Sequence, residues 1–209
     1  MAALSMSESK PQLRILYRNR RRGIETGQRE DWDRRICDGL LNLPILRPGF
    51  RISAFWPFDG EPDLRPALRT LHEQGHSVFL PLIPRQAGAS LEMHRWEPDS
   101  ELASGELGIL EPAARDATPP GDLDLVLVPL VAWDPQGHRL GMGAGYYDRY
   151  LGSVMGQSRP VRAGVAYSVQ RSDSLPTDDW DVPLHSILTE AGWTRFTPPG
   201  CPDPTQERT

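Results

Sequence analysis

Cysteine is nearly absent from the chain, which has only Cys37 and Cys201 among its 209 residues. Neither cysteine belongs to a CxxC pair or has a histidine at metal-ligand spacing, which argues against a disulfide framework and a structural zinc site. The histidines form no HExxH pattern, and no nucleophile elbow or Ser/His/Asp order can be recognised. The five histidines lie at positions 72, 76, 94, 138 and 185. Structural zinc and serine-hydrolase chemistry are therefore not expected.

Long apolar runs are also absent, since none approaches the roughly 20 residues that a membrane-spanning helix needs. The opening stretch MAALSMSESKPQLR lacks the apolar core of a secretory signal. There is no excess of basic charge, because 23 Lys and Arg stand against 28 Asp and Glu, for a net charge of -5. The whole chain therefore has no attraction to nucleic acid or to an anionic membrane. We expect a cytoplasmic protein with no membrane or nucleic-acid partner, in which any anion site is local.

The length of the chain suits one sizeable hydrophobic core, so we expect a single domain over residues 1–196. The 21 prolines and 19 glycines predict many loops. The final segment TPPGCPDPTQERT, residues 197–209, is expected to be a disordered tail. We expect the protein to be a monomer.

Strands alternate with helices along the chain, which predicts an α/β domain. Helical periodicity covers residues 10–41 with a break near 23–27, and residues 123–134 form the clearest buried strand. The other expected elements are strands at 51–58, 77–83 and 161–168, helices at 60–75 and 145–155, a strand and a turn at 185–193, and loops with minor strands over 85–121. We therefore expect three layers, with helices on both faces of a mostly parallel sheet.

The stretch HRLGMGAGYYDRYL, residues 138–151, lies between the clearest strand and an expected helix. Open α/β sheets place their ligands at such strand ends. The glycines at 141, 143 and 145 allow positive φ and a close approach of backbone N–H groups to phosphate oxygens. Arg139 is suited to a bidentate contact with the same anion, and Asp148 to a divalent cation beside it. These features favour a phosphate site with a metal ion.

Spacing alone leaves a second interpretation of this stretch open. It is not a GxGxxG fingerprint, and no Lys-Ser/Thr follows as in a P-loop. A glycine-rich turn that only connects a strand to a helix is equally compatible with the pattern, with Tyr146 and Tyr147 as core anchors.

The longer segment DLVLVPLVAWDPQGHRLGMGAGYYDRYL resembles the signature of the 5-formyltetrahydrofolate cyclo-ligase family, also called 5,10-methenyltetrahydrofolate synthetase. The resemblance implies a Rossmann-like, NagB/RpiA/CoA-transferase-like fold. It assigns Asp148 to Mg²⁺ and gives catalytic roles to Arg139, Tyr147 and Asp148. The residues that it assigns to ATP are Arg139, Gly141, Met142, Gly143, Ala144, Gly145, Tyr146 and Tyr147, of which Gly143, Gly145, Tyr146 and Tyr147 also bind folate.

Two earlier segments resemble the same family in the same order. In KPQLR, Lys10 and Arg14 lie one helical turn apart, and the resemblance makes them ATP phosphate ligands. A solvated basic face is the alternative, because RNRRR follows. In AFWPFDGEPDL, the resemblance makes Glu61 an acceptor for pterin nitrogens and Trp56 a stacking or packing partner. A glutamate at a helix start otherwise compensates the helix dipole.

Two further segments extend the resemblance to roughly residues 10–192. EMHRW implies that Met93 lines the folate pocket, although a lone methionine is more often part of the core. LPTDDWDVPLHSILTE implies that Asp181 is a second metal-linked carboxylate, with Asp178 and Asp179 as rivals. The chain departs from the family pattern at Ala144, where many members have Lys, and at His185, where Asp is frequent.

The function implied by the resemblance is conversion of 5-formyltetrahydrofolate to 5,10-methenyltetrahydrofolate, with ATP as co-substrate, Mg²⁺ as cofactor and release of ADP and phosphate. The folate partner can be polyglutamylated. Two other classes of function stay open at this point. One is a non-catalytic nucleotide- or RNA-binding relative, and the other is a phosphotransferase that acts on another small molecule through the same phosphate loop.

Overall fold

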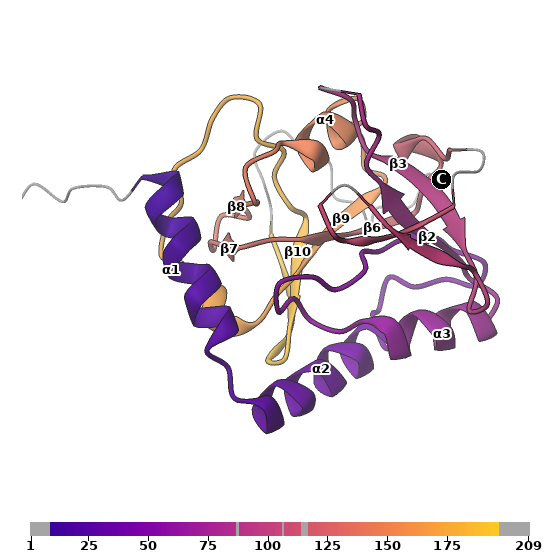
Figure 1. Cartoon of the computed structure of the whole chain (residues 1–209), viewed down its shortest axis with the longest axis horizontal. Helices are drawn as coiled ribbons and strands as arrows, with labels where there is room; N and C mark the ends of the chain where they lie inside the picture. The colour runs from indigo at the N-terminus through magenta and orange to yellow at the C-terminus, as the bar shows by residue number, and fades with distance from the viewer. Residues whose placement is uncertain (1–8, 87, 106, 114–116, 197–209) are drawn as a thin grey trace, which may run out of the picture.

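The computed structural model describes residues 9–86, 88–105, 107–113 and 117–196. The tail expected at 197–209 lies outside these residues. The described chain forms a seven-stranded sheet with the order β11-β10-β9-β6-β1-β2-β3 (Figure 1). The strands are β1 (Arg51–Ser53), β2 (Ser77–Leu82), β3 (Glu92–Trp96), β6 (Leu125–Pro129), β9 (Val161–Val165), β10 (Ser186–Thr189) and β11 (Gly192–Arg195).

The five central strands of this sheet are parallel, and an antiparallel strand closes each edge. Parallel ladders join β2 to β1, β1 to β6, β6 to β9 and β9 to β10. β3 pairs antiparallel with β2, and β11 pairs antiparallel with β10. Two small hairpin sheets stand apart, β4 (Leu102–Ser104) with β5 (Leu110–Pro112) and β7 (Ala132–Trp133) with β8 (Arg139–Leu140). The predicted mostly parallel sheet is confirmed.

The helices lie where the sequence predicts them, although the helix expected at 60–75 covers only 65–73. They are α1 (Lys10–Arg22), α2 (Thr26–Leu41), α3 (Arg65–Glu73) and α4 (Tyr146–Gly152), with short 3-10 turns at Pro120–Asp122 and Ser168–Gln170. The predicted break between the first two helices is confirmed, and α3 has its proline in the opening turn. Gly75 has φ +85°, a conformation that favours glycine, just beyond the end of α3.

The sheet is buried on both faces, as the aliphatic strands predict. Leu125 and Leu127 of β6 pack in the core that α2 and α3 cover. The alternate residues Val126 and Val128 pack in a second core, to which α4 contributes Leu151. Figure 1 shows α2 and α3 along one side of the sheet and α4 on the opposite side. The three-layer α/β class is therefore confirmed.

Helix α1 does not cover a face of the sheet. It stands beside the β7 and β8 hairpin (Figure 1) and packs Leu13 and Tyr17 against Val131, Ala132 and Leu140. The side chains of α1 therefore reach the segments that leave β6.

Some predicted bounds were wrong. The expected strand at 123–134 is interrupted, because β6 ends at Pro129 and β7 belongs to another sheet. The carbonyls of Leu130 and Val131 do not join a ladder across the break, since both accept hydrogen bonds from the Gln170 amide. The strand expected at 51–58 ends at 53, and the helix expected at 145–155 ends at 152. The turn expected near 190 leads into a further strand, β11.

The strand order reverses between β1 and β6, and this reversal positions a ligand site. After β1 the chain passes to α3 on one face, and after β6 it passes to α4 on the other. In open α/β sheets the crevice outside the carboxyl ends of two such strands is where ligands bind. The glycine-rich stretch 138–151 follows β6 and therefore borders this crevice.

No helix in the described part of the chain combines the length and apolarity that crossing a bilayer requires.

Gly164 provides a test of packing behind this crevice. A Cβ at this position in β9 would lie 2.7 Å from the Cδ1 atoms of Ile187 and Leu184 and 2.8 Å from Cδ2 of Leu130. We expect Gly164→Ala to lower the free energy of unfolding by about 1 to 3 kcal/mol, because three buried side chains must shift to admit the methyl group. Urea unfolding followed by circular dichroism measures the change.

Gly27→Ala is the matched control, because a Cβ at that position in α2 meets nothing within 4 Å. We expect it to be neutral or stabilising, since alanine is favoured over glycine in a helix. Equal unfolding free energies for the Gly164→Ala protein and the unmodified protein would contradict the packing argument.

Candidate active site

A cavity of about 380 Å³ opens at the carboxyl ends of β1, β2 and β6. Residues of both segments that leave β1 and β6 line it, together with side chains from α1 and the first turn of α4. Its wall includes these predicted site residues: Lys10, Arg14, Trp56, Glu61, Arg139, Gly141, Met142, Gly143, Ala144, Gly145, Tyr146, Tyr147, Asp148 and Asp181. The fold thus gathers segments that are up to 171 residues apart around one cavity.

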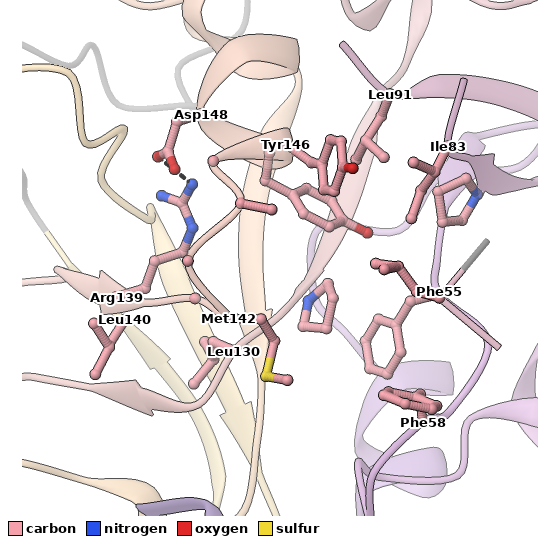
Figure 2. A pocket seen from close by; sticks show the side chains of 18 of the residues that line it. Phe55, Phe58, Ile83, Leu91, Leu130, Arg139, Leu140, Met142, Tyr146 and Asp148 are labelled. Atoms are coloured by element: carbon pink, nitrogen blue, oxygen red, sulfur yellow. Dashed lines mark hydrogen bonds and ion pairs between the residues drawn. The ribbon is translucent and has the colours of Figure 1, made fainter. Parts of the chain in front are cut away.

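The cavity has a charged end and an apolar end. Figure 2 shows Arg139 and Asp148 at one side, with Phe55, Ile83 and Leu91 at the other. The apolar wall also includes Phe58, Pro81, Leu107, Ile109, Pro129 and Leu130. Sequence analysis missed these side chains as site residues. Most of them lie at or near the ends of strands, but only the strand order brings those strand ends together.

The glycine-rich loop approaches α1 closely. Gly143 has φ +109° and Gly145 has φ +66°, and both values lie in the range that favours glycine. The φ angle of Gly141 is not in this range. Arg14 donates its Nε–H to the Gly141 carbonyl at 2.9 Å. A Cβ on Gly143 would lie 3.3 Å from Cζ of Arg14. Two of the three glycines therefore have the predicted positive φ. The guanidinium of Arg14 lies directly against the loop.

Arg139 and Asp148 form an ion pair inside the cavity. Nη2 of Arg139 lies 2.5 Å from Oδ1 of Asp148, and the Arg139 side chain is only 5% exposed. Nη1 of Arg139 donates to the Val182 carbonyl, and the Val182 N–H donates to Oδ1 of Asp148 at 3.1 Å. The predicted phosphate ligand and the predicted metal ligand are thus held side by side and anchored to the segment that carries Asp181.

Lys10 makes a second charged cluster with the late acidic loop. Its Nζ lies 2.6 Å from Oδ2 of Asp178 and 2.8 Å from Oδ2 of Asp181. Burial by itself would lower the pKa of Lys10, but the hydrogen bonds to the two carboxylates outweigh it and raise that pKa. Asp178 and Asp181 both line the cavity, whereas Asp179 does not. Two of the three carboxylates that the sequence offers as metal ligands therefore face the cavity, and their metal role stays a prediction.

Glu61 lies in the loop before α3 rather than in the helix, and its side chain is 10% exposed. One carboxylate oxygen accepts the Phe58 N–H at 3.2 Å, and the other lies 3.7 Å from Nη1 of Arg21. Burial raises the pKa of Glu61 to about 7, although Arg21 and the Phe58 N–H oppose the shift. An ionisable group with such a pKa in a cleft is typical of a functional site.

Two aromatic side chains face the same part of the cavity. The buried hydroxyl of Tyr147 has no hydrogen-bond partner in the described structure. Burial raises the pKa of Tyr147, and the negative charge of Glu61 adds to this shift, so the two groups are electrostatically coupled. Trp56 lies 6.3 Å from Trp96 between ring centroids, and Cζ of Arg65 lies 5.8 Å above its ring. An unpartnered hydroxyl and an aromatic ring are suited to a planar, hydrogen-bonding ligand.

One prediction about this region, that Met93 lines the pocket, is corrected. Met93 does not line the cavity. It lies on β3, paired with Pro81 of β2, and its side chain is fully buried in the hydrophobic core. His185, which stands where the family often has Asp, is also outside the cavity wall. It is buried, and its ring nitrogens contact the backbone N–H and the guanidinium of Arg162. Met93 packs in the core from β3, and His185, which precedes β10, packs against Arg162.

The other departure from the family pattern, Ala144, does lie on the cavity wall. A cation is present close by, because Nη1 of Arg149 donates to the Ala144 carbonyl at 2.9 Å. The same guanidinium lies 5.1 Å from the centroid of the Tyr146 ring. Arg149 thus supplies positive charge to the loop from a neighbouring position.

Glu111 is a further buried carboxylate on the wall that sequence analysis did not assign to the site. Gly105 makes room for it, since a Cβ at that position would lie 2.2 Å from Cδ of Glu111. Any side chain at residue 105 would therefore displace Glu111.

The oxygen donors in the cavity suit Mg²⁺ better than zinc. Among the described residues, no group of three or more His, Cys, Asp or Glu side chains is arranged to hold a metal ion. Asp148 and Asp181 are linked through Val182, whose N–H binds Asp148. Mg²⁺ is commonly held by one or two carboxylates, substrate phosphates and water rather than by a full protein cage. Two carboxylates beside the glycine-rich loop fit that pattern.

Comparison with known proteins agrees with this geometry. The model of the 5-formyltetrahydrofolate cyclo-ligase family matches residues 6–190. The 5-formyltetrahydrofolate cyclo-ligase of Escherichia coli K12 is 34% identical over 177 residues, covering 83% of this chain and 96% of the relative. The Haemophilus influenzae protein of the same name is 33% identical over 184 residues, covering 87% and 98%.

Solved structures give the same result. The structure of 5,10-methenyltetrahydrofolate synthetase from Aquifex aeolicus has a TM-score of 0.77 at 30% identity and covers 96% of this chain and 95% of that one. A synthetase structure from Mycoplasma pneumoniae, with a TM-score of 0.71 at 24% identity, shares the fold. The chain therefore belongs to the 5-formyltetrahydrofolate cyclo-ligase family and is an enzyme of that family.

Proposed function

We propose that this protein converts 5-formyltetrahydrofolate to 5,10-methenyltetrahydrofolate, with ATP as co-substrate and Mg²⁺ as cofactor, and releases ADP and phosphate. The observation that carries this proposal is the division of one cavity into a cationic, glycine-rich end and an aromatic end with a buried carboxyl. The first end suits a triphosphate and the second suits a pterin. Family membership supplies the reaction that joins the two.

The formyl oxygen of the folate is a poor leaving group, and the reaction must convert it into a good one. The formyl oxygen attacks the γ-phosphorus of ATP, ADP leaves, and an iminium phosphate forms on the folate. The neighbouring secondary amine of the same folate then attacks the iminium carbon and loses its proton to solvent, and the C–O bond to phosphate breaks. Inorganic phosphate departs with the electron pair of that bond. The protein therefore has to position two substrates and stabilise charge, and it needs no covalent step of its own.

At the phosphate end, Lys10, Arg14 and Arg139 provide three cations from two segments of the chain. Each is held in place by the contacts already described, so little reorganisation is needed when negative charge develops. Asp148 and Asp181 are the residues that would hold Mg²⁺ beside these cations. The metal ion would supply charge neutralisation to the phosphate oxygens.

At the folate end, Glu61 accepts hydrogen bonds from pterin N–H groups in its ionised form. Tyr147, with its unpartnered hydroxyl, is positioned to donate a hydrogen bond to the folate. Tyr146 and Trp56 provide aromatic surface on the cavity wall, and Phe55 excludes water from the same region. These contacts orient the formyl group toward the phosphate end.

Purified protein tests the proposal directly. We expect an increase in methenyl-product absorbance that requires 5-formyltetrahydrofolate, ATP and Mg²⁺ together, with ADP formed in equal amount. Omitting each component in turn is the control. Folded protein that binds neither folate nor ATP, or that forms product without ATP consumption, contradicts the proposal.

A substitution at Asp148 tests whether this residue has a metal-binding role or only a structural one. We expect Asp148→Asn to lower kcat by at least about 100-fold, because the variant loses the negative charge that faces the metal and the phosphates. The amide oxygen can still accept the Val182 N–H, but Arg139 loses its charge partner, so we expect a folded protein with a lowered melting temperature. Steady-state kinetics and thermal unfolding measure the two effects.

Asp31→Asn is the matched control for this variant, since Asp31 is exposed on α2 and pairs with Arg34. It should retain the turnover of the unmodified protein. Near-normal turnover in a folded Asp148→Asn protein would remove the metal role from Asp148.

Glu61 predicts a pH dependence of folate binding. Its pKa of about 7 in the free protein means that the carboxyl gains its negative charge as the pH rises from 6 to 8. If the ionised form accepts the pterin N–H groups, affinity should rise by about tenfold over this range. Fluorescence titration with 5-formyltetrahydrofolate at both pH values measures the change.

Glu61→Gln is the control for the pH dependence, because the amide does not titrate. This variant should bind more weakly at pH 8 and show a nearly flat profile. A profile that keeps the same slope in Glu61→Gln assigns the titration to another group.

A further inference from the structure

Arg21 is a fully buried arginine in the last turn of α1, and sequence analysis gave it no role. A buried cation is costly unless its hydrogen-bond donors and its charge are satisfied. The groups that surround Arg21 therefore indicate which parts of the structure its guanidinium holds in place.

The guanidinium of Arg21 joins the two segments that form the cavity. Its Nε–H donates to the Asp59 carbonyl at 3.1 Å, and Nη2 lies 2.9 Å from Oδ2 of Asp59. Nη1 donates to the Leu130 carbonyl at 3.2 Å and lies 3.7 Å from Oε1 of Glu61. Asp59 and Glu61 follow β1, whereas Leu130 follows β6, and both Glu61 and Leu130 line the cavity.

Asp59 occupies a conformation that needs such support. It has φ +53° and is the only non-glycine residue with positive φ in the described part of the chain. Arg18 and Arg22 also bind its carboxylate, with Nε distances of 2.8 and 2.6 Å. Burial would raise the pKa of Asp59, but the hydrogen bonds from Arg18 and Arg22 and the charge of Arg21 lower it. Residues in strained backbone conformations persist only where surrounding contacts enforce them.

The three arginines around Asp59 are not equivalent. Arg22 is 52% exposed and Arg18 is 32% exposed, and each contacts only Asp59 among the residues of this loop. Arg21 is fully buried, and among these three it alone reaches both Glu61 and the segment after β6. This difference makes Arg22 a matched comparison for Arg21.

We propose that Arg21 is a positioning residue for the folate substrate, which fixes Glu61 at the cavity by tying the loop 59–61 to the end of β6. The inference rests on the proposed function, in which Glu61 binds the pterin. The groups that face Glu61 are Arg21 of α1, Asp59 and the Phe58 N–H of its own loop, and Tyr147 of α4. Arg21 is the cation among them, so its removal changes both the position and the charge state of Glu61.

A double-mutant cycle between Arg21 and Glu61 tests the proposal in the full chain. We expect Arg21→Gln to raise the KM for 5-formyltetrahydrofolate by about tenfold and to leave the KM for ATP unchanged. In the Glu61→Gln background, Arg21→Gln should add little further change, because its effect passes through Glu61. If the increases in folate KM caused by the two single substitutions multiply in the double variant, the two residues act independently and the proposal is overturned.

Arg22→Gln removes a positive charge that pairs with the same Asp59 carboxylate. This variant should leave the KM for folate unchanged. An equal rise in Arg22→Gln and Arg21→Gln would assign the effect to Asp59 in general and overturn the specific role of Arg21. Arg21→Lys decides the matter if Arg21→Gln does not fold. Lysine keeps the charge but cannot satisfy three partners, so a raised folate KM is expected and an unchanged one contradicts the proposal.

The unmodified protein distinguishes this inference from the proposed function. If it shows no folate- and ATP-dependent turnover, the proposed function fails before Arg21 is tested. If it is active and the Arg21 variants keep its folate KM, the proposed function stands and the role of Arg21 is wrong.

Discussion

The parallel pairing of β1 with β6 determines where the functional side chains lie. The chain leaves β1 toward α3 on one face of the sheet and leaves β6 toward α4 on the other. The departing segments meet across the crevice between the two strand ends, where the first turn of α4 joins them. Phe55 and Glu61 approach from one side, and the glycine-rich loop with Asp148 approaches from the other. A cavity with two chemically different walls follows from this reversal of strand order.

Helix α1 connects the two walls. Its residues 10, 14 and 21 are separated by four and seven positions, so one stripe of the helix carries Lys10, Arg14 and Arg21. The first two lie at the charged end of the cavity, and the guanidinium of the third lies 3.7 Å from the Glu61 carboxylate. The chain has a net charge of -5, and this helix concentrates positive charge where an anionic substrate would be bound.

The charges in the cavity are fixed because they are paired. Arg139 contacts Asp148, Lys10 contacts Asp178 and Asp181, and Arg21 contacts Asp59. Partly buried charges need such partners to offset the loss of hydration, and the partners hold each side chain in one place. Glu61 differs, because within the described part of the chain its ionised form has only the 3.7 Å contact with Arg21 and one backbone N–H. Its raised pKa reflects this incomplete pairing, and a pterin with several N–H donors could complete it.

The sequence by itself determined the features that depend on neighbouring residues. The two-helix start, the buried strand and the glycine loop were predictable because periodicity and φ preferences act within a few residues. The cavity wall was predictable in large part because a motif of nearly 30 residues resembles one family. Only the tertiary structure decided that Met93 belongs to the core, that Asp178 and Asp181 but not Asp179 face the cavity, and that Arg21 is buried beside Glu61. These outcomes depend on contacts such as that between Arg21 and Leu130, which are 109 residues apart. Burial and charge pairing over such separations are fixed by strand order and packing, which no local pattern encodes.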